Sequence, residues 1–215
     1  MRTLIWAVYL GGLLLVGLLG GRTAMTIYLL ASALVVTLFR RPLVLALTRL
    51  SSRLGLMRQT IEAMPSAIVL TRAPGPADAA RPTLAALAAA SFSDAGAWTI
   101  PQLPRIHVSL MVQREEGILA AVESASPIGA QVNLHTLYPD GRVVTFTNSE
   151  LPAPPTLRSN VQRTQLPRCI PGALVARALA ERPKAQCRAL SVEDAPRVYE
   201  QLYADEIRFR KATGT

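Results

Sequence analysis

Two long apolar runs dominate the first third of the chain. Residues 4–20 and 24–39 contain no charged side chain, and a short Gly-Arg-Thr step separates them. As helices they would reach roughly 26 and 24 Å, against a hydrocarbon layer of about 30 Å. A hairpin that turns at Arg22 keeps this charge out of the layer, whereas one continuous helix would carry it through. We therefore predict two transmembrane helices in residues 1–41.

Two other interpretations of these runs stay open. A secretory signal peptide normally has a shorter apolar region with a cleavage site directly after it, and the small residues at 31–33 lie inside the second run. A pair of buried helices in a globular domain would need polar faces, which neither run has.

After residue 97 the pattern changes to a period of two. Five segments alternate in this way and are predicted to be strands: 97–101, 105–112, 117–124, 130–138 and 142–148. Residues 138–141 (Tyr-Pro-Asp-Gly) form a strong turn signal, because Pro fixes φ and Gly accepts a positive φ. Residues 114–117 form a second one. The sequence therefore predicts an antiparallel meander.

Helical patterns flank this meander along the chain. Residues 83–90, 172–181 and 191–211 are predicted to be helices, and five prolines between 151 and 171 predict an irregular surface loop. A sheet with one polar face and helices at both chain ends is typical of an α+β fold. The predicted fold class is thus α+β: an N-terminal transmembrane helical hairpin followed by an antiparallel β-meander of about four to five strands, with helices packed on one face.

The domain organisation follows from these patterns: transmembrane helices in 1–41, an amphipathic juxtamembrane helix in 42–59, and a soluble α+β domain in 60–215. In 42–59 leucines recur at helical spacing with arginines on one flank. This helix either lies in the headgroup layer or packs on the domain as a stalk. The predicted membrane-interface residues are Arg40, Arg41, Arg49 and Arg53.

The net charge is concentrated in the apolar N-terminal segment. The chain has 23 Lys and Arg residues against 14 Asp and Glu, a formal net charge of +9. Residues 1–61 hold seven arginines and no acid, so 16 basic and 14 acidic residues leave the remainder at only +2. Positive flanks mark the cytoplasmic side of a span, which predicts an integral membrane protein with a cytoplasmic domain. The nearly neutral remainder argues against a nucleic-acid partner.

Candidate chemistry is sparse. The sequence has no Gly-rich phosphate loop, no Cys-x-x-Cys, no His-x-x-x-His and no Gly-x-Ser-x-Gly. No catalytic residue, cofactor or metal site is therefore predicted. The polar face of strand 130–138 is a candidate ligand-binding surface, formed by Gln131, Asn133 and His135. A cross-strand polar contact is the plainer interpretation of His135.

The two cysteines, Cys169 and Cys187, are too few for a disulfide scaffold or a four-thiolate zinc site. In a cytoplasmic domain they would be reduced thiols. If only one span inserts, the domain would face outward and the two could pair.

Three stretches resemble those of a known group of proteins. Residues 91–96 lead from a helix into the sheet, and residues 138–141 precede the hairpin strand 144–148. The closing helix carries Tyr199, Tyr203, Glu206 and Arg208. Together they resemble uncharacterised bacterial membrane-anchored proteins with a small α+β domain. No activity is assigned to that group, so the resemblance implies no catalytic residue.

The leading functional expectation is a membrane-anchored interaction or scaffold domain, with the lipid bilayer and an unidentified protein as partners. The absence of a catalytic motif favours it over an enzyme. The alternative is a small-ligand-binding or enzymatic domain that uses the polar sheet face near His135, beneath the 151–171 loop.

Overall fold

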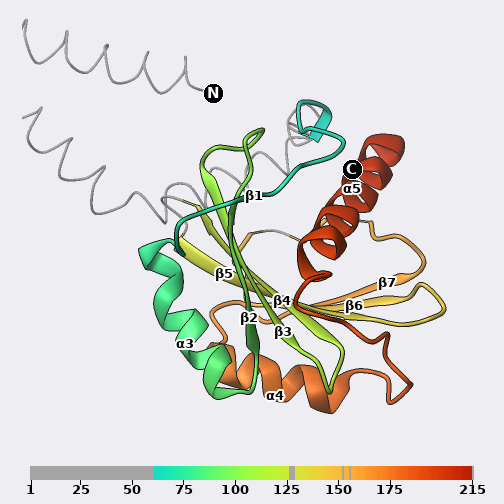
Figure 1. Ribbon diagram of the computed structural model, residues 1–215. Helices are drawn as coiled ribbons and strands as arrows, with labels where there is room; N and C mark the ends of the chain where they lie inside the picture. The colour runs from blue at the N-terminus through green and yellow to red at the C-terminus, as the bar shows by residue number, and fades with distance from the viewer. Residues whose placement is uncertain (1–60, 126–128, 152, 155, 215) are drawn as a thin grey trace, which may run out of the picture. The chain divides into compact units, whose positions relative to one another are not determined.

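A computed structural model describes residues 61–125, 129–151, 153–154 and 156–214 (Figure 1). The chain divides into two units, Met1–Val44 and Leu45–Thr215. All described residues belong to the second unit, and the fold below is that of this unit alone.

The centre of the fold is a seven-stranded sheet whose spatial order follows the sequence. Its strands are β1 (Thr71–Arg72), β2 (Ser93–Thr99), β3 (Ile106–Gln113), β4 (Ile118–Ala125), β5 (Gly129–Leu137), β6 (Val143–Thr147) and β7 (Val161–Gln165). Neighbours from β1 to β6 pair antiparallel, and β7 runs parallel to β6. The predicted turn at 138–141 joins β5 to β6, and Gly141 there adopts φ +82°, which favours glycine.

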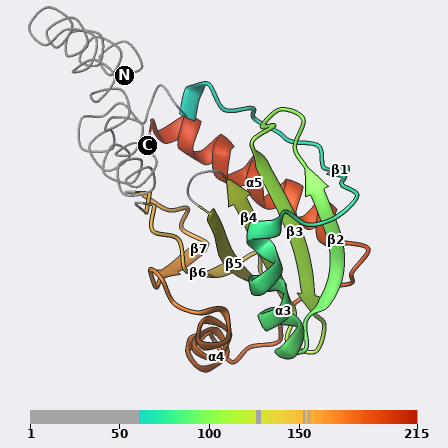
Figure 2. The ribbon, with the colours of Figure 1, turned by 90° about the vertical axis from the view of Figure 1, so that its left-hand side faces the viewer.

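Helices cover both faces of the sheet. They are a short 3₁₀ helix η1 (Asp78–Ala80), α3 (Arg81–Ala89), α4 (Pro171–Glu181) and α5 (Ala195–Thr213). α3 and α4 begin with proline in the first turn, where its missing N–H costs nothing. α3 and α4 lie on one face and α5 crosses the other (Figures 1 and 2).

Each face has its own core because strand side chains alternate. On the α3 and α4 side, Val132 and Leu134 of β5 pack with Leu87 and Leu174 of the helices. On the α5 side the buried strand residues come from β2 to β4, and they include Val108, Leu110, Val112, Leu119 and Ala121. Over β5 to β7, this second face carries several polar side chains among its apolar ones. The candidate site lies over this part of the sheet.

The predicted fold class is wrong in its strand number and its layering. The five predicted strands correspond to β2–β6, but β1 and β7 extend the sheet to seven. β7 lies within the proline-rich stretch that predicts a loop, and its mostly polar residues hide it from an apolar pattern. Helices cover both faces of the sheet, not one. Residues 118–122 of β4 are therefore all buried, as expected only for a strand covered on both sides.

The predicted transmembrane architecture is contradicted. Within the described ranges, no helix is long and apolar enough to cross a membrane. The two apolar runs and the predicted 42–59 helix lie outside the described residues. The predicted interface arginines lie outside them as well: Arg40, Arg41, Arg49 and Arg53. The prediction rested on the hydropathy and charge pattern of the sequence, and runs of 17 and 16 residues lie at or just below the lower end of the about 17–25 residues that a span needs. The predicted membrane-anchored class and integral-membrane location are therefore not carried further.

Candidate functional site

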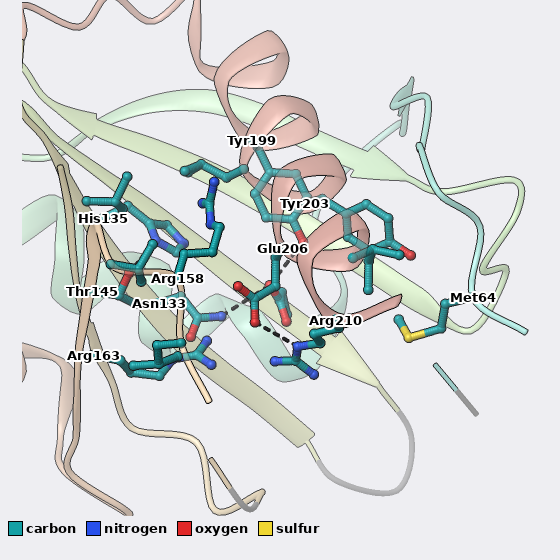
Figure 3. Close-up of a pocket in the computed structure, with 16 residues that line it drawn as sticks. Met64, Asn133, His135, Thr145, Arg158, Arg163, Tyr199, Tyr203, Glu206 and Arg210 are labelled. Atoms are coloured by element: carbon teal, nitrogen blue, oxygen red, sulfur yellow. Dashed lines mark hydrogen bonds and ion pairs between the residues drawn. The ribbon is translucent and has the colours of Figure 1, made fainter. Parts of the chain in front are cut away.

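A pocket of about 200 Å³ lies between α5 and the polar part of the sheet (Figure 3). Strands β4 to β7 supply one wall and α5 supplies the opposite wall. The 156–160 segment contributes Leu157 and Arg158, and Met64 comes from the segment before β1. The pocket therefore gathers residues from parts of the chain that are far apart in sequence.

Three polar side chains form a row across the sheet wall. The strand register places His135 of β5 beside Thr145 of β6, and Thr145 beside Arg163 of β7. His135 Nδ1 and Thr145 Oγ1 are 3.0 Å apart and share a hydrogen bond. The tight turn at 138–141 fixes the β5–β6 register, so the sequence of this hairpin determines which residues meet.

A carboxylate held by neutral donors forms the next part of the wall. Glu123 Oε1 accepts hydrogen bonds from Asn133 Nδ2 at 3.1 Å and from the Tyr199 hydroxyl at 2.9 Å. Glu123 Oε2 accepts one from Gln131 Nε2 at 3.0 Å. Burial, reinforced by Glu123, raises the pKa of Tyr199 well above its ordinary value. Tyr199 thus stays a proton donor and ties α5 to β4.

The helix wall is a single stripe of α5. Tyr199, Tyr203, Glu206 and Arg210 are spaced four, three and four residues apart, which places them on one helix face. Arg210 Nε donates to Glu206 Oε1 at 2.7 Å. Figure 3 shows this stripe opposite the strand residues.

Three donor groups around the pocket have no partner in the part of the chain that the structure describes. The Arg163 guanidinium makes no hydrogen bond or ion pair there. Arg158 is paired with Asp205 through Nη1 at 3.2 Å, but its buried Nε has no acceptor. The buried Tyr203 hydroxyl has none either. Partial burial lowers the pKa of Arg163 from its usual range, which marks a costly environment for its charge.

His135 is neutral at physiological pH. Burial, with a smaller contribution from the charge of Arg163, lowers its pKa from 6.5 to about 3. A histidine with this pKa is a weak base, and its ring serves as a hydrogen-bonding group. It is therefore a poor candidate for general acid–base catalysis near pH 7.

The structure brings together part of the predicted ligand surface. Asn133 and His135 line the pocket, whereas Gln131 lies beside it and holds Glu123. α5 covers this face together with the 156–160 segment, not the predicted loop alone. Cys169 and Cys187 are free and do not line the pocket.

Sequence reasoning missed the charged residues of the site. Glu123 had a readable signal, because it is the one charged residue in the otherwise apolar and small β4. Arg158 and Arg163 lie in the proline-rich segment, which offered no periodic pattern. Glu206 and Arg210 read as ordinary charges of a surface helix, and only the packing of α5 turns them inward.

A larger hollow of about 490 Å³ lies near α3 and β2 and offers less chemistry. Proline, glycine and alanine supply much of its lining, with Pro74, Gly75 and Pro76 in sequence. Its Asp94 carboxylate already accepts the Gly96 N–H at 2.8 Å. Among the described residues, no three His, Cys, Asp or Glu side chains converge to hold a metal ion. The pocket beneath α5 is therefore the candidate site.

Comparisons with known proteins add no relative. No family model matches the chain, no curated protein matches its sequence, and no solved structure matches its fold. The resemblance to bacterial proteins of unassigned activity stays a prediction. The residues of the pocket are what indicate a function.

Proposed function

We propose that this domain binds a small polar molecule in the pocket beneath α5. The observation that carries the proposal is a cavity lined by Arg163, whose guanidinium has no partner among the described residues. Arg158 and Tyr203 also line this cavity, and each holds a buried donor without an acceptor. An occupant that supplies acceptor oxygens gives the Arg163 guanidinium the partner that it lacks, and a hydrogen bond to a charged group contributes about 1.5–3 kcal/mol. The volume of about 200 Å³ lies below the roughly 300–1,000 Å³ of pockets for drug-sized ligands, which suits a smaller compound.

The electrostatics favour binding over catalysis. General acid–base groups work best when their pKa lies near the operating pH. The pKa of His135 is about 3, and burial raises the pKa values of Tyr199 and Tyr203 above 10. These groups orient a ligand through hydrogen bonds without exchanging protons with it. We therefore favour a binding domain over an enzyme.

The interaction or scaffold interpretation has less support in the fold. Among the described residues, the large apolar side chains that stand exposed are Val69 and Ile170. They belong to separate segments, one before β1 and one before α4. A protein-binding surface usually presents a contiguous apolar patch of several hundred Å². Two such side chains fall short of that.

A blocked pocket tests the proposal. Leu157 lies in a connecting segment and lines the cavity, so Leu157→Trp adds an aromatic ring there at a position that tolerates change. A thermal-shift screen of small metabolites against the full chain is expected to give compounds that raise the melting temperature by several degrees. Leu157→Trp is expected to abolish this rise.

The matched control is Val69→Trp, which adds the same side chain at an exposed position away from the pocket lining. It is expected to leave the ligand-induced rise intact. A screen without stabilising compounds would count against the proposal, as would compounds whose effect survives Leu157→Trp unchanged.

A further inference from the structure

We infer that the pocket beneath α5 takes a small organic monocarboxylate, with Arg163 as the group that pairs with its anion. This inference rests on the proposed function, because it names the ligand class of the same site. It follows from how the charges around the pocket are already paired.

Each charged side chain of the pocket has at least one partner, with one exception among the described residues. Arg210 pairs with Glu206, and Arg158 pairs with Asp205. Glu123 receives its three hydrogen bonds from neutral donors. Arg163 has no direct partner among the described residues, although the carboxylates of Glu206 and Glu123 act on it through space. Among the described residues that line the pocket, Arg163 is therefore the cation whose guanidinium has all its donors unused.

The geometry of a guanidinium selects a planar anion. Its N–H groups form a fork that fits both oxygens of a carboxylate, and such charge-assisted pairs are about twice as strong as neutral hydrogen bonds. Thr145 stands beside Arg163 in the strand register, with His135 next to it. Their polar groups extend the hydrogen-bonding surface around the anion.

The charge count favours one negative charge over two. Together with Asp205 and its second partner Arg208, the lining arginines and carboxylates sum to +1: four positive and three negative charges. A monocarboxylate brings a single negative charge to Arg163. A phosphate dianion would bring two into the range of Glu123 and Glu206, and like charges at short range repel.

The rest of the lining favours an organic anion over an inorganic one. Apolar side chains make up a large part of the walls: Met64, Val143, Leu157, Val161, Leu202 and Ile207. Such walls pack against a hydrocarbon body and gain free energy from its burial. An inorganic ion would leave them without contact.

Titration calorimetry on the full chain tests the inference with matched probes. Benzoate and lactate are compared with benzamide, which keeps the ring and loses the charge, and with inorganic phosphate. Benzoate or lactate is expected to bind at least tenfold more tightly than benzamide or phosphate, as the strength of one charged pair implies. Arg163→Gln is expected to remove this preference, and Arg163→Lys to retain part of it because the charge stays while the fork is lost.

The control is Arg177→Gln on α4, whose side chain is exposed, pairs with Glu181 and lies outside the pocket lining. It is expected to leave carboxylate binding unchanged. Equal binding of benzoate and benzamide, tighter binding of phosphate, or carboxylate binding that survives Arg163→Gln would overturn the monocarboxylate inference. Failure of both carboxylates, while the metabolite screen yields other compounds sensitive to Leu157→Trp, would overturn it and leave the proposed function standing. Failure of the screen as well would remove both.

Discussion

Glu123→Ala is expected to lower the free energy of unfolding by about 3 kcal/mol, since each buried donor left without an acceptor costs about 1–3 kcal/mol. Asn133 Nδ2 and the Tyr199 hydroxyl both donate to Glu123 Oε1, and both residues are only 6% exposed. Removing the carboxylate takes away the acceptor that joins β4, β5 and α5. Water entering from the pocket offsets part of the cost. Urea unfolding of the full chain measures the change.

Two matched variants separate this effect from the loss of a charge. Glu123→Gln keeps a carbonyl acceptor of the same length and is expected to cost only about 1 kcal/mol. Glu115→Ala removes an exposed carboxylate in the β3–β4 turn and is expected to change stability by less than about 0.5 kcal/mol. Equal effects of Glu123→Ala and Glu115→Ala would show that the carboxylate does not organise the site.

The second large effect is a loss of stability on mild acidification. The folded protein holds His135 neutral with a pKa of about 3, whereas the unfolded chain takes up a proton near pH 6.5. Below pH 6.5 the unfolded state therefore binds more protons, and the free energy of unfolding falls as the pH falls. Between pH 7 and pH 5 this linkage amounts to about 2 kcal/mol. The loss continues until the pH approaches 3.

The window from pH 7 to pH 5 isolates this histidine. The chain has only one other histidine, His107. Three carboxylates have lowered pKa values, so their contributions to the free energy of unfolding are lost only at lower pH: Asp140, Glu193 and Asp194. His135→Asn is expected to flatten the stability profile in this window. His107→Asn, at an exposed position, is expected to keep the slope. If the free energy of unfolding of His135→Asn still fell between pH 7 and pH 5, the pH dependence would come from another group.

Local patterns predicted the central strands because the physics of each was local. The Tyr-Pro-Asp-Gly turn at 138–141 requires only its own residues, and it brings His135 beside Thr145 without further information. The alternation of Gln131, Asn133 and His135 also placed them on one face. That face holds the pocket wall, and two of the three line the cavity.

The missing parts depended on tertiary packing. α5 covers the polar face because Val198 and its neighbours also bury the apolar half of the same face, over β2 to β4. No pattern within 195–213 states which surface it will cover. β7 joins the sheet through parallel pairing with β6 across a proline-rich connection. No local sequence pattern therefore predicts that Arg163 lies in the site. The pattern of hydropathy and charge in the first third of the chain likewise predicted a membrane architecture that the described helices do not support.

The most direct test of the central claim is to follow the backbone amide resonances of the full chain during a titration with benzoate, lactate, benzamide or phosphate. The account predicts saturable shifts for at least one probe, concentrated in β5, β6, β7 and α5, with the Thr145 and Arg163 amides among the most affected. It also predicts that Leu157→Trp suppresses these shifts. No saturable shift with any of the four probes would contradict the monocarboxylate inference. Saturable shifts concentrated in α3 and β2, around the hollow at Pro74 to Pro76, would contradict a ligand site beneath α5.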